Sequence, residues 1–135
     1  EHGVVSLSDA GAHLIYMCDA GYGLHLLSRW VRELEFFTLQ EGVRRLTSHP
    51  ADLYGIKGRG RLTPGSHADM VIFDPATIGV SDPHRIADLP GGGPRTIRKP
   101  TGIHGVWING TQVYDGEEYV SLAKGPGHVL RDFAA

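Results

Sequence analysis

Apolar and polar positions divide the chain into a first part with mainly helical spacing and a second part with short apolar runs. Near the start, an apolar segment predicts a strand over residues 3–8, and glycines predict a loop over 9–23. Apolar residues close to helical spacing then predict helices over 24–36 and 38–48. A further short helical turn is expected over 50–54, because it starts with proline and glycine follows it.

The second of these helices carries a start signal in its sequence. Thr38 and Glu41 have the spacing of a capping box, in which Glu41 can reach back to the Thr38 amide. Leu39, Val43 and Leu46 then recur at helical spacing, so we expect them to form a buried stripe.

The second part of the chain has the pattern of a β-rich domain. Pro64-Gly65 is a turn pair, and the nearly continuous apolar run that follows predicts a strand over 68–73. Two more strands are predicted over 103–109 and 111–114, and Asn109-Gly110 between them is a type I′ hairpin signal.

Two features of this second part are interpreted as structural. Residues 79–101 are polar and contain Gly91-Gly-Gly-Pro94, which predicts a surface loop. Asp69 is charged and lies beside an apolar strand, and we interpret it as a carboxylate that accepts hydrogen bonds from turn amides.

Composition narrows the possible partners. Hydrophobic residues make up 41% of the chain and charged residues 21%, as in ordinary globular proteins, and the net charge of −2 gives no reason to expect nucleic acid or an anionic membrane as a partner. Cys18 is the only cysteine, so an internal disulfide is excluded. No apolar run approaches the roughly 20 residues of a membrane span. We therefore expect a cytoplasmic protein.

The segment from Arg59 to Asp74 reads RGRLTPGSHADMVIFD. It resembles the C-terminal signature of the metal-dependent amidohydrolase superfamily, in which the chain returns from a catalytic barrel into a small β-sandwich. Residues 4–13, 29–33 and 46–51 extend the resemblance, and together they look most like the N-acyl-D-amino-acid deacylase (D-aminoacylase) branch.

The resemblance implies a mixed α/β chain with two unequal regions. Residues 1–54 would supply the last strand and helices of a (β/α)8 amidohydrolase barrel, and residues 55–135 a small composite β-sandwich domain. A barrel of this type needs about 250 residues, whereas this chain has 135 and begins with Glu1. The family also places a His-x-His metal-binding pair after its first strand, and the eight histidines here include no such pair. We therefore expect the C-terminal portion of a longer polypeptide, whose remaining barrel is its partner.

Asp9 is the position that matches the aspartate at the end of the eighth barrel strand. The resemblance implies that Asp9 is the catalytic base or a metal ligand in a zinc enzyme, where a carboxylate can move a proton from water to the leaving amine. His13, four residues later, is a candidate substrate-binding residue. From the residues alone, an aspartate after a strand is usually a helix cap or turn residue. His13 could also orient Asp9 or cap the loop.

The expected reaction is hydrolysis of a C–N amide bond in a small molecule, with N-acyl-D-amino acids as the first candidates. Enzymes of this branch carry a His-Pro-Arg motif after the aspartate, and its arginine helps to hold the substrate carboxylate. The corresponding loop here has no arginine before Arg29, so cyclic amides, lactams and N-acyl derivatives without a free carboxylate stay open as substrates.

A non-catalytic structural or assembly domain is the alternative function. For the chain by itself we expect no hydrolase activity and no bound zinc. We also expect self-association through the unpaired strand edges of residues 3–8, because such edges attract partners.

Overall fold

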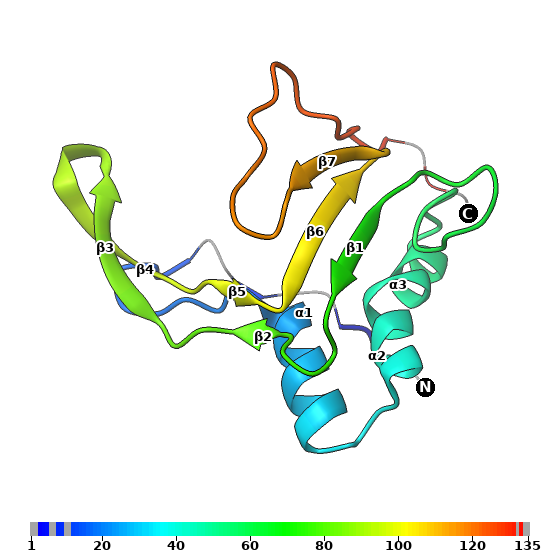
Figure 1. Ribbon diagram of the computed structural model, residues 1–135, viewed down its shortest axis with the longest axis horizontal. Helices are drawn as coiled ribbons and strands as arrows, with labels where there is room; N and C mark the ends of the chain where they lie inside the picture. The colour runs from blue at the N-terminus through cyan, green and yellow to red at the C-terminus, as the bar shows by residue number, and fades with distance from the viewer. Residues whose placement is uncertain (1–2, 6–7, 10–11, 132, 134–135) are drawn as a thin grey trace.

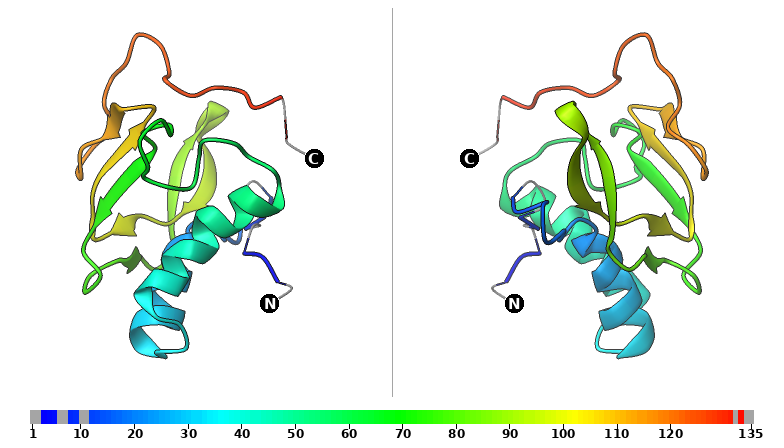
Figure 2. Two further views of the ribbon diagram at one scale, coloured as in Figure 1. Left: turned by 90° about the vertical axis from the view of Figure 1, so that its right-hand side faces the viewer. Right: turned by 90° about the vertical axis from the view of Figure 1, so that its left-hand side faces the viewer.

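The chain forms a group of helices followed by antiparallel strands, as a computed structural model shows for residues 3–5, 8–9, 12–131 and 133 (Figure 1). The helices lie together beside the strand β1 (Met70–Phe73; Figures 1 and 2). The strands β3 (His84–Leu89) and β4 (Gly93–Ile97) project away from the helices as an arm (Figure 1). The mixed α/β class is therefore confirmed. Within the described residues, no helix has the length and apolar character needed to cross a membrane.

The predicted helices are present with shifted ends. They are α1 (Tyr22–His25), η1 (Leu26–Glu33), α2 (Leu39–Leu46) and α3 (Ser48–Leu53). The segment η1 continues α1 directly and is π-helical. Its widened hydrogen bonding extends to its end, where the Leu34 amide donates to the Arg29 carbonyl at 2.9 Å.

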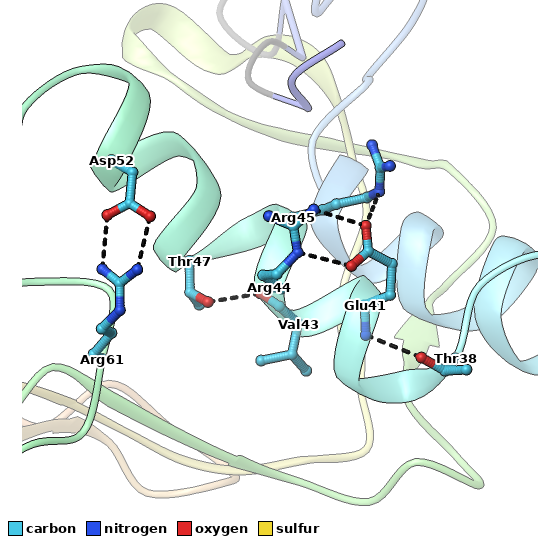
Figure 3. Close-up of polar contacts among 8 residues, drawn as sticks. All are labelled: Thr38, Glu41, Val43, Arg44, Arg45, Thr47, Asp52 and Arg61. Atoms are coloured by element: carbon cyan, nitrogen blue, oxygen red, sulfur yellow. Dashed lines mark hydrogen bonds and ion pairs between the residues drawn. The ribbon is translucent and has the colours of Figure 1, made fainter. Parts of the chain in front are cut away.

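The start of α2 confirms one half of the expected capping box and corrects the other. Thr38 Oγ1 accepts the Glu41 backbone N–H at 3.2 Å (Figure 3). The Glu41 carboxylate does not return to the Thr38 amide but accepts Arg44 Nε at 2.7 Å and lies 2.8 Å from Arg45 Nε. Two guanidinium groups one turn further along the helix are stronger partners for a carboxylate than a neutral amide.

The contact between η1 and α2 depends on a glycine. The predicted stripe of Leu39, Val43 and Leu46 is only half-buried, whereas Gly42 is fully buried. A Cβ atom at position 42 would lie 2.6 Å from Val31 Cγ2. The two helices therefore approach as closely as they do because position 42 has no side chain.

The main sheet has three antiparallel strands in the order β1-β6-β7, with β1 at Met70–Phe73, β6 at Ile103–Ile108 and β7 at Thr111–Tyr114. Met70 pairs with Trp107 across β1 and β6. Asn109 and Gly110, at φ 48° and 78°, form the turn between β6 and β7, as the sequence predicts for a type I′ hairpin.

The prediction of a surface loop over residues 79–101 is wrong. This segment contains four strands and a short turn of helix. They are β2 (Gly79–Val80), β3 (His84–Leu89), η2 (Pro90–Gly92), β4 (Gly93–Ile97) and β5 (Pro100–Thr101). The strand β3 pairs with β4 to form the arm, and β2 pairs with β5 at its base.

The sequence does not predict the arm because its strands lack the apolar alternation that marks a half-buried strand. Most residues of β3 are exposed, and only Thr96 in β4 is buried. Backbone pairing and a bidentate ion pair hold the arm together instead, with Arg95 Nε donating to Asp88 Oδ1 at 2.6 Å.

The expected strand over residues 3–8 is wrong for the residues that can be assessed. Residues 3–5 and 8 are not in a strand, and residues 6–7 lie outside the described residues. A strand needs neighbours that accept and donate its backbone hydrogen bonds, and none is paired with residues 3–5 or 8. A closed barrel and a two-sheet sandwich both remain predictions for a longer protein.

The fold leaves a large apolar surface beside α1 and η1. Phe36 is 67% exposed and Trp30 is 40% exposed, although their rings pack edge to face at 5.7 Å. They border a hollow of about 390 Å³ that extends to Val5 and Phe37. Exposed apolar area of this kind is typical of an interaction surface.

Candidate active site

The loop that carries Asp9 is held by local backbone hydrogen bonds. Asp9 has a φ of 49°, in the left-handed region, and its carbonyl accepts the Ala12 N–H at 3.0 Å. Aspartate adopts this conformation more readily than most residues. The turn leaves the Asp9 side chain exposed to solvent, so its carboxylate is accessible to a ligand.

Asp9 lines a cavity of about 470 Å³ at the start of α1. The cavity brings together charged and polar side chains from distant parts of the chain. Its lining residues are Ser8, Asp9, Asp19, Ala20, Gly21, Tyr22, His25 and Arg98. Two carboxylates, one imidazole, one phenol and one guanidinium therefore surround a space large enough for a small molecule.

Asp19, Tyr22, His25 and Arg98 are lining residues that the sequence does not predict, and the least expected of them is Arg98. It follows β4, far along the chain from Asp9, and its Nε donates to the Ser81 carbonyl at 2.9 Å. The Thr96 N–H donates to the Leu14 carbonyl at 2.6 Å, which ties β4 to the loop after Asp9. No sequence signal could have placed Arg98 here, because its position depends on strands that the pattern did not predict.

His13 does not line the cavity with Asp9. Its φ is 59°, its side chain is exposed, and its ring centre lies 5.3 Å from that of Tyr16. The His13 carbonyl accepts the backbone N–H groups of Tyr16 and Met17, each at 3.0 Å. In this chain His13 is thus a turn residue, and the imidazole beside Asp9 is that of His25.

Asp69 has the structural role expected from the sequence. Its Oδ1 accepts the Asn109 backbone N–H at 2.8 Å, and its Oδ2 is paired with Arg59. Partial burial alone would raise the pKa of Asp69, but the Asn109 amide and the Arg59 guanidinium outweigh it, and the pKa is lowered. Asp69 is therefore an ionised carboxylate that holds a turn, and it is not among the residues that line the cavity of Asp9.

The donor set for a metal is incomplete in the part of the chain that the structure describes. No group of three or more histidine, cysteine, aspartate or glutamate side chains there is arranged to hold a metal ion. Asp9, Asp19 and His25 line one cavity and are chemically suitable ligands, but they do not form a closed site. These residues fit a metal only as part of a larger ligand set.

Comparison with known proteins gives consistent results. The sequence profile described as "Amidohydrolase family" matches residues 8–114. The chain is 39% identical over 106 residues to an N-acyl-D-aspartate deacylase of Alcaligenes xylosoxydans xylosoxydans, covering 78% of this chain and 19% of that protein. It is 35% identical over 114 residues to a D-aminoacylase of the same organism, covering 82% of this chain and 20% of that protein.

A solved structure gives the same result. The chain superimposes on a crystal structure of D-aminoacylase with a TM-score of 0.58 and 31% identity, over 74% of this chain and 19% of that one. Another structural study of D-aminoacylase describes a binuclear metal centre in that enzyme. The chain thus spans about a fifth of the length of the proteins it matches.

Proposed function

Because the chain belongs to the amidohydrolase family, we propose that it is part of a metal-dependent enzyme that hydrolyses the C–N amide bond of N-acyl-D-amino acids. The names of its relatives support this substrate class, since they include deacylases of N-acyl-D-amino acids. In this proposal residues 1–54 complete a catalytic barrel and residues 55–135 form a small β-domain beside it. The exposed apolar surface around Trp30 and Phe36 is then where the rest of the barrel packs.

Asp9 is the proposed catalytic carboxylate, and one observation carries this role. Its side chain is exposed in a cavity of about 470 Å³, where it shares the lining with His25 and Asp19. A carboxylate in such a position can accept a proton from the attacking water. It can then deliver that proton to the leaving nitrogen as the C–N bond breaks. His13 keeps a proposed substrate-binding role only if the loop after Asp9 is rearranged in the longer protein.

The proposed cofactor is zinc, with Asp9 as one of its ligands or as the base beside it. When bound, zinc supplies a Lewis acid that polarises the amide carbonyl and makes a water molecule more acidic. The binuclear metal centre of D-aminoacylase supports a metal at this site. The described residues provide too few ligands on their own, so the remaining ligands are proposed to come from the rest of the longer polypeptide.

The decisive experiment uses the full-length protein that contains this chain. Its metal content is measured, and it is then assayed with the N-acetyl derivatives of D-aspartate, D-glutamate, D-leucine and D-methionine and with their L-enantiomers. We expect bound zinc and release of free D-amino acids. The absence of both metal and turnover would reject the proposal.

A structural or assembly role is the second candidate, and the incomplete donor set in the described residues favours it for the chain by itself. Residues 1–135 alone are proposed to be inactive in the same assay. Residues 3–5 and 8 are not in a strand, so strand edges there no longer support self-association. Sedimentation of this chain tests the proposed self-association directly, and a concentration-independent monomer would contradict it. Zinc-dependent deacylation by residues 1–135 alone would contradict the proposal that this chain supplies only part of the active site.

A further inference from the structure

We infer that Arg98 binds the carboxylate of the substrate and is the specificity-determining residue of this site. This inference rests on the proposed function. It assigns a partner to the substrate carboxylate, for which the loop after Asp9 has no arginine. In an N-acyl-D-amino acid, the carboxylate and the scissile amide nitrogen are attached to the same carbon atom. The group that recognises the carboxylate must therefore lie in the same cavity as the catalytic carboxylate.

Arg98 is the source of that positive charge in the structure. It is the only arginine or lysine among the described residues that line the cavity of Asp9. Two carboxylates, Asp9 and Asp19, line the same cavity and would repel an anionic substrate wherever their charge is not offset by a cation. The Arg98 guanidinium in the same lining offsets part of this negative charge and can hold a carboxylate through two parallel hydrogen bonds.

The Arg98 guanidinium is held by one hydrogen bond, and its terminal nitrogens are available to a ligand. Its Nε donates to the Ser81 carbonyl at 2.9 Å, which fixes one edge of the group. Its two terminal nitrogens have no ion-pair partner among the residues that the structure describes. Arg95, three residues earlier, differs in this respect, because Asp88 accepts hydrogen bonds from its Nε at 2.6 Å and from a terminal nitrogen at 2.7 Å.

The base of the arm provides a rigid support for Arg98. Next to it, the Lys99 N–H donates to Ser81 Oγ at 2.9 Å, and the Ser81 N–H donates to the Lys99 carbonyl at 2.8 Å. Two residues before Arg98, Thr96 is buried, and its backbone N–H donates a hydrogen bond to the Leu14 carbonyl. The backbone around Arg98 is thus tied both to β2 and to the loop after Asp9, so the side chain can act as a positioned ligand rather than a mobile surface charge.

The test measures substrate preference in the full-length protein. Wild type, Arg98→Ala and Arg98→Lys are assayed with an N-acetyl-D-amino acid and with its carboxamide, which lacks the negative charge. Arg85→Ala is the matched control, because it removes an exposed arginine from β3 of the same arm that has no ion-pair partner among the described residues. Thermal melting verifies that all variants are folded.

We expect Arg98→Ala to lower kcat/KM for the carboxylate substrate about 10- to 100-fold, mainly through KM, with less than about a threefold change for the carboxamide. Arg98→Lys should recover only part of the loss, since an ammonium group lacks the planar fork. Arg85→Ala should keep the wild-type preference.

The inference about Arg98 is overturned, and the proposed function is not, if wild type hydrolyses the N-acetyl-D-amino acid but shows no preference for it over the carboxamide. It is also overturned if Arg98→Ala keeps the wild-type preference. If wild type hydrolyses neither substrate, the proposed function fails and this inference fails with it.

Discussion

Asp69 accepts the backbone N–H of Asn109 at 2.8 Å, so one carboxylate links the segment before β1 to the turn between β6 and β7. Arg59 is paired with the same carboxylate and lies close to the side chain of Asn109, its terminal nitrogen donating to Asn109 Oδ1 at 3.3 Å. Asn109 Nδ2 in turn donates to the Pro126 carbonyl at 2.6 Å. Together these contacts join the RGRLTPG segment, the main sheet and the tail of the chain.

This network predicts that Asp69→Asn loosens the turn at Asn109. The amide of asparagine keeps the shape of the side chain but loses the charge that Arg59 and the Asn109 N–H bind. We expect the free energy for local opening of the turn to fall by about 1–3 kcal/mol. Hydrogen exchange over residues 103–114 measures this change, because the turn amides would exchange faster.

The control for this prediction is Asp82→Asn. Asp82 is exposed, and its carboxylate has no hydrogen-bond partner among the described residues. The Asp82→Asn variant should leave hydrogen exchange over residues 103–114 unchanged. Equal exchange in the Asp69 and Asp82 variants would show that the Asp69 carboxylate does not stabilise the turn.

The turns and caps of this chain could be predicted from its sequence because each depends on a few adjacent residues. Asn109-Gly110 sets its own backbone conformation, and Thr38 caps a helix through an amide three residues away. The family relationship could be predicted for a similar reason, since it rests on a few continuous segments, above all the one from Arg59 to Asp74. Signals of this kind need no knowledge of tertiary contacts.

The arm and its contribution to the site could not be predicted in this way. The strand β3 exposes most of its residues, so its sequence shows no burial pattern. Arg98 reaches the cavity of Asp9 only because β4 and β5 pair with β3 and β2 and because Thr96 is bonded to Leu14. These are contacts between segments far apart in sequence, and neither local propensity nor periodicity contains them.

Glu41 gives a prediction about pH. The hydrogen bond from Arg44 is the main reason that the pKa of Glu41 falls from 4.5 to about 2. Since the pKa is lowered in the folded chain, the ionised carboxylate stabilises α2 fully above pH 4.5, and this contribution is lost as the pH falls toward about 2. An NMR titration of the Glu41 carboxyl should give a midpoint well below that of an unpaired glutamate.

Two variants test the cause of the lowered pKa. In Arg44→Gln the midpoint of Glu41 should rise toward 4.5, because its main partner is gone. High salt should raise it as well, since the pair is exposed to solvent. Arg61→Gln is the control, because Arg61 pairs with Asp52 rather than Glu41 (Figure 3). A Glu41 midpoint that does not respond to Arg44→Gln would refute the explanation.

The close contact at Gly42 predicts that Gly42→Ala is destabilising even though alanine is the better helix former. Alanine gains about 1 kcal/mol of helix propensity over glycine. The new Cβ would lie 2.6 Å from Val31 Cγ2, and valine has little rotamer freedom with which to avoid it. Overpacking of this kind costs about 1–3 kcal/mol, so we expect a net loss of up to about 2 kcal/mol in thermal or denaturant unfolding.

A second substitution separates crowding from other effects of Gly42→Ala. In the double variant Gly42→Ala with Val31→Ala, the methyl group that collides with position 42 is absent. The two changes should therefore be less destabilising together than the sum of the single variants. Strict additivity would mean that the approach of η1 and α2 does not limit the residue at position 42.

The proposed role of Asp9 is tested by Asp9→Asn in the full-length protein. Asparagine is nearly isosteric with aspartate, and the Asp9 side chain is exposed, so the melting temperature should change little. A neutral amide cannot accept the proton of the attacking water or pass it to the leaving nitrogen. We therefore expect kcat to fall by about 10²–10⁴-fold with a much smaller change in KM, because the group acts mainly in the transition state.

The paired variants are His13→Ala and Asp19→Asn. His13 lies outside the cavity of Asp9, and Asp19 shares the cavity without matching the family's catalytic position. If His13 contacts substrate in the longer protein, its variant should raise KM more than it lowers kcat. Asp19→Asn should lose far less kcat than Asp9→Asn, because only Asp9 is proposed to move the proton. Near-normal kcat in Asp9→Asn with zinc still bound would reduce Asp9 to a turn residue and remove the mechanistic part of the proposal.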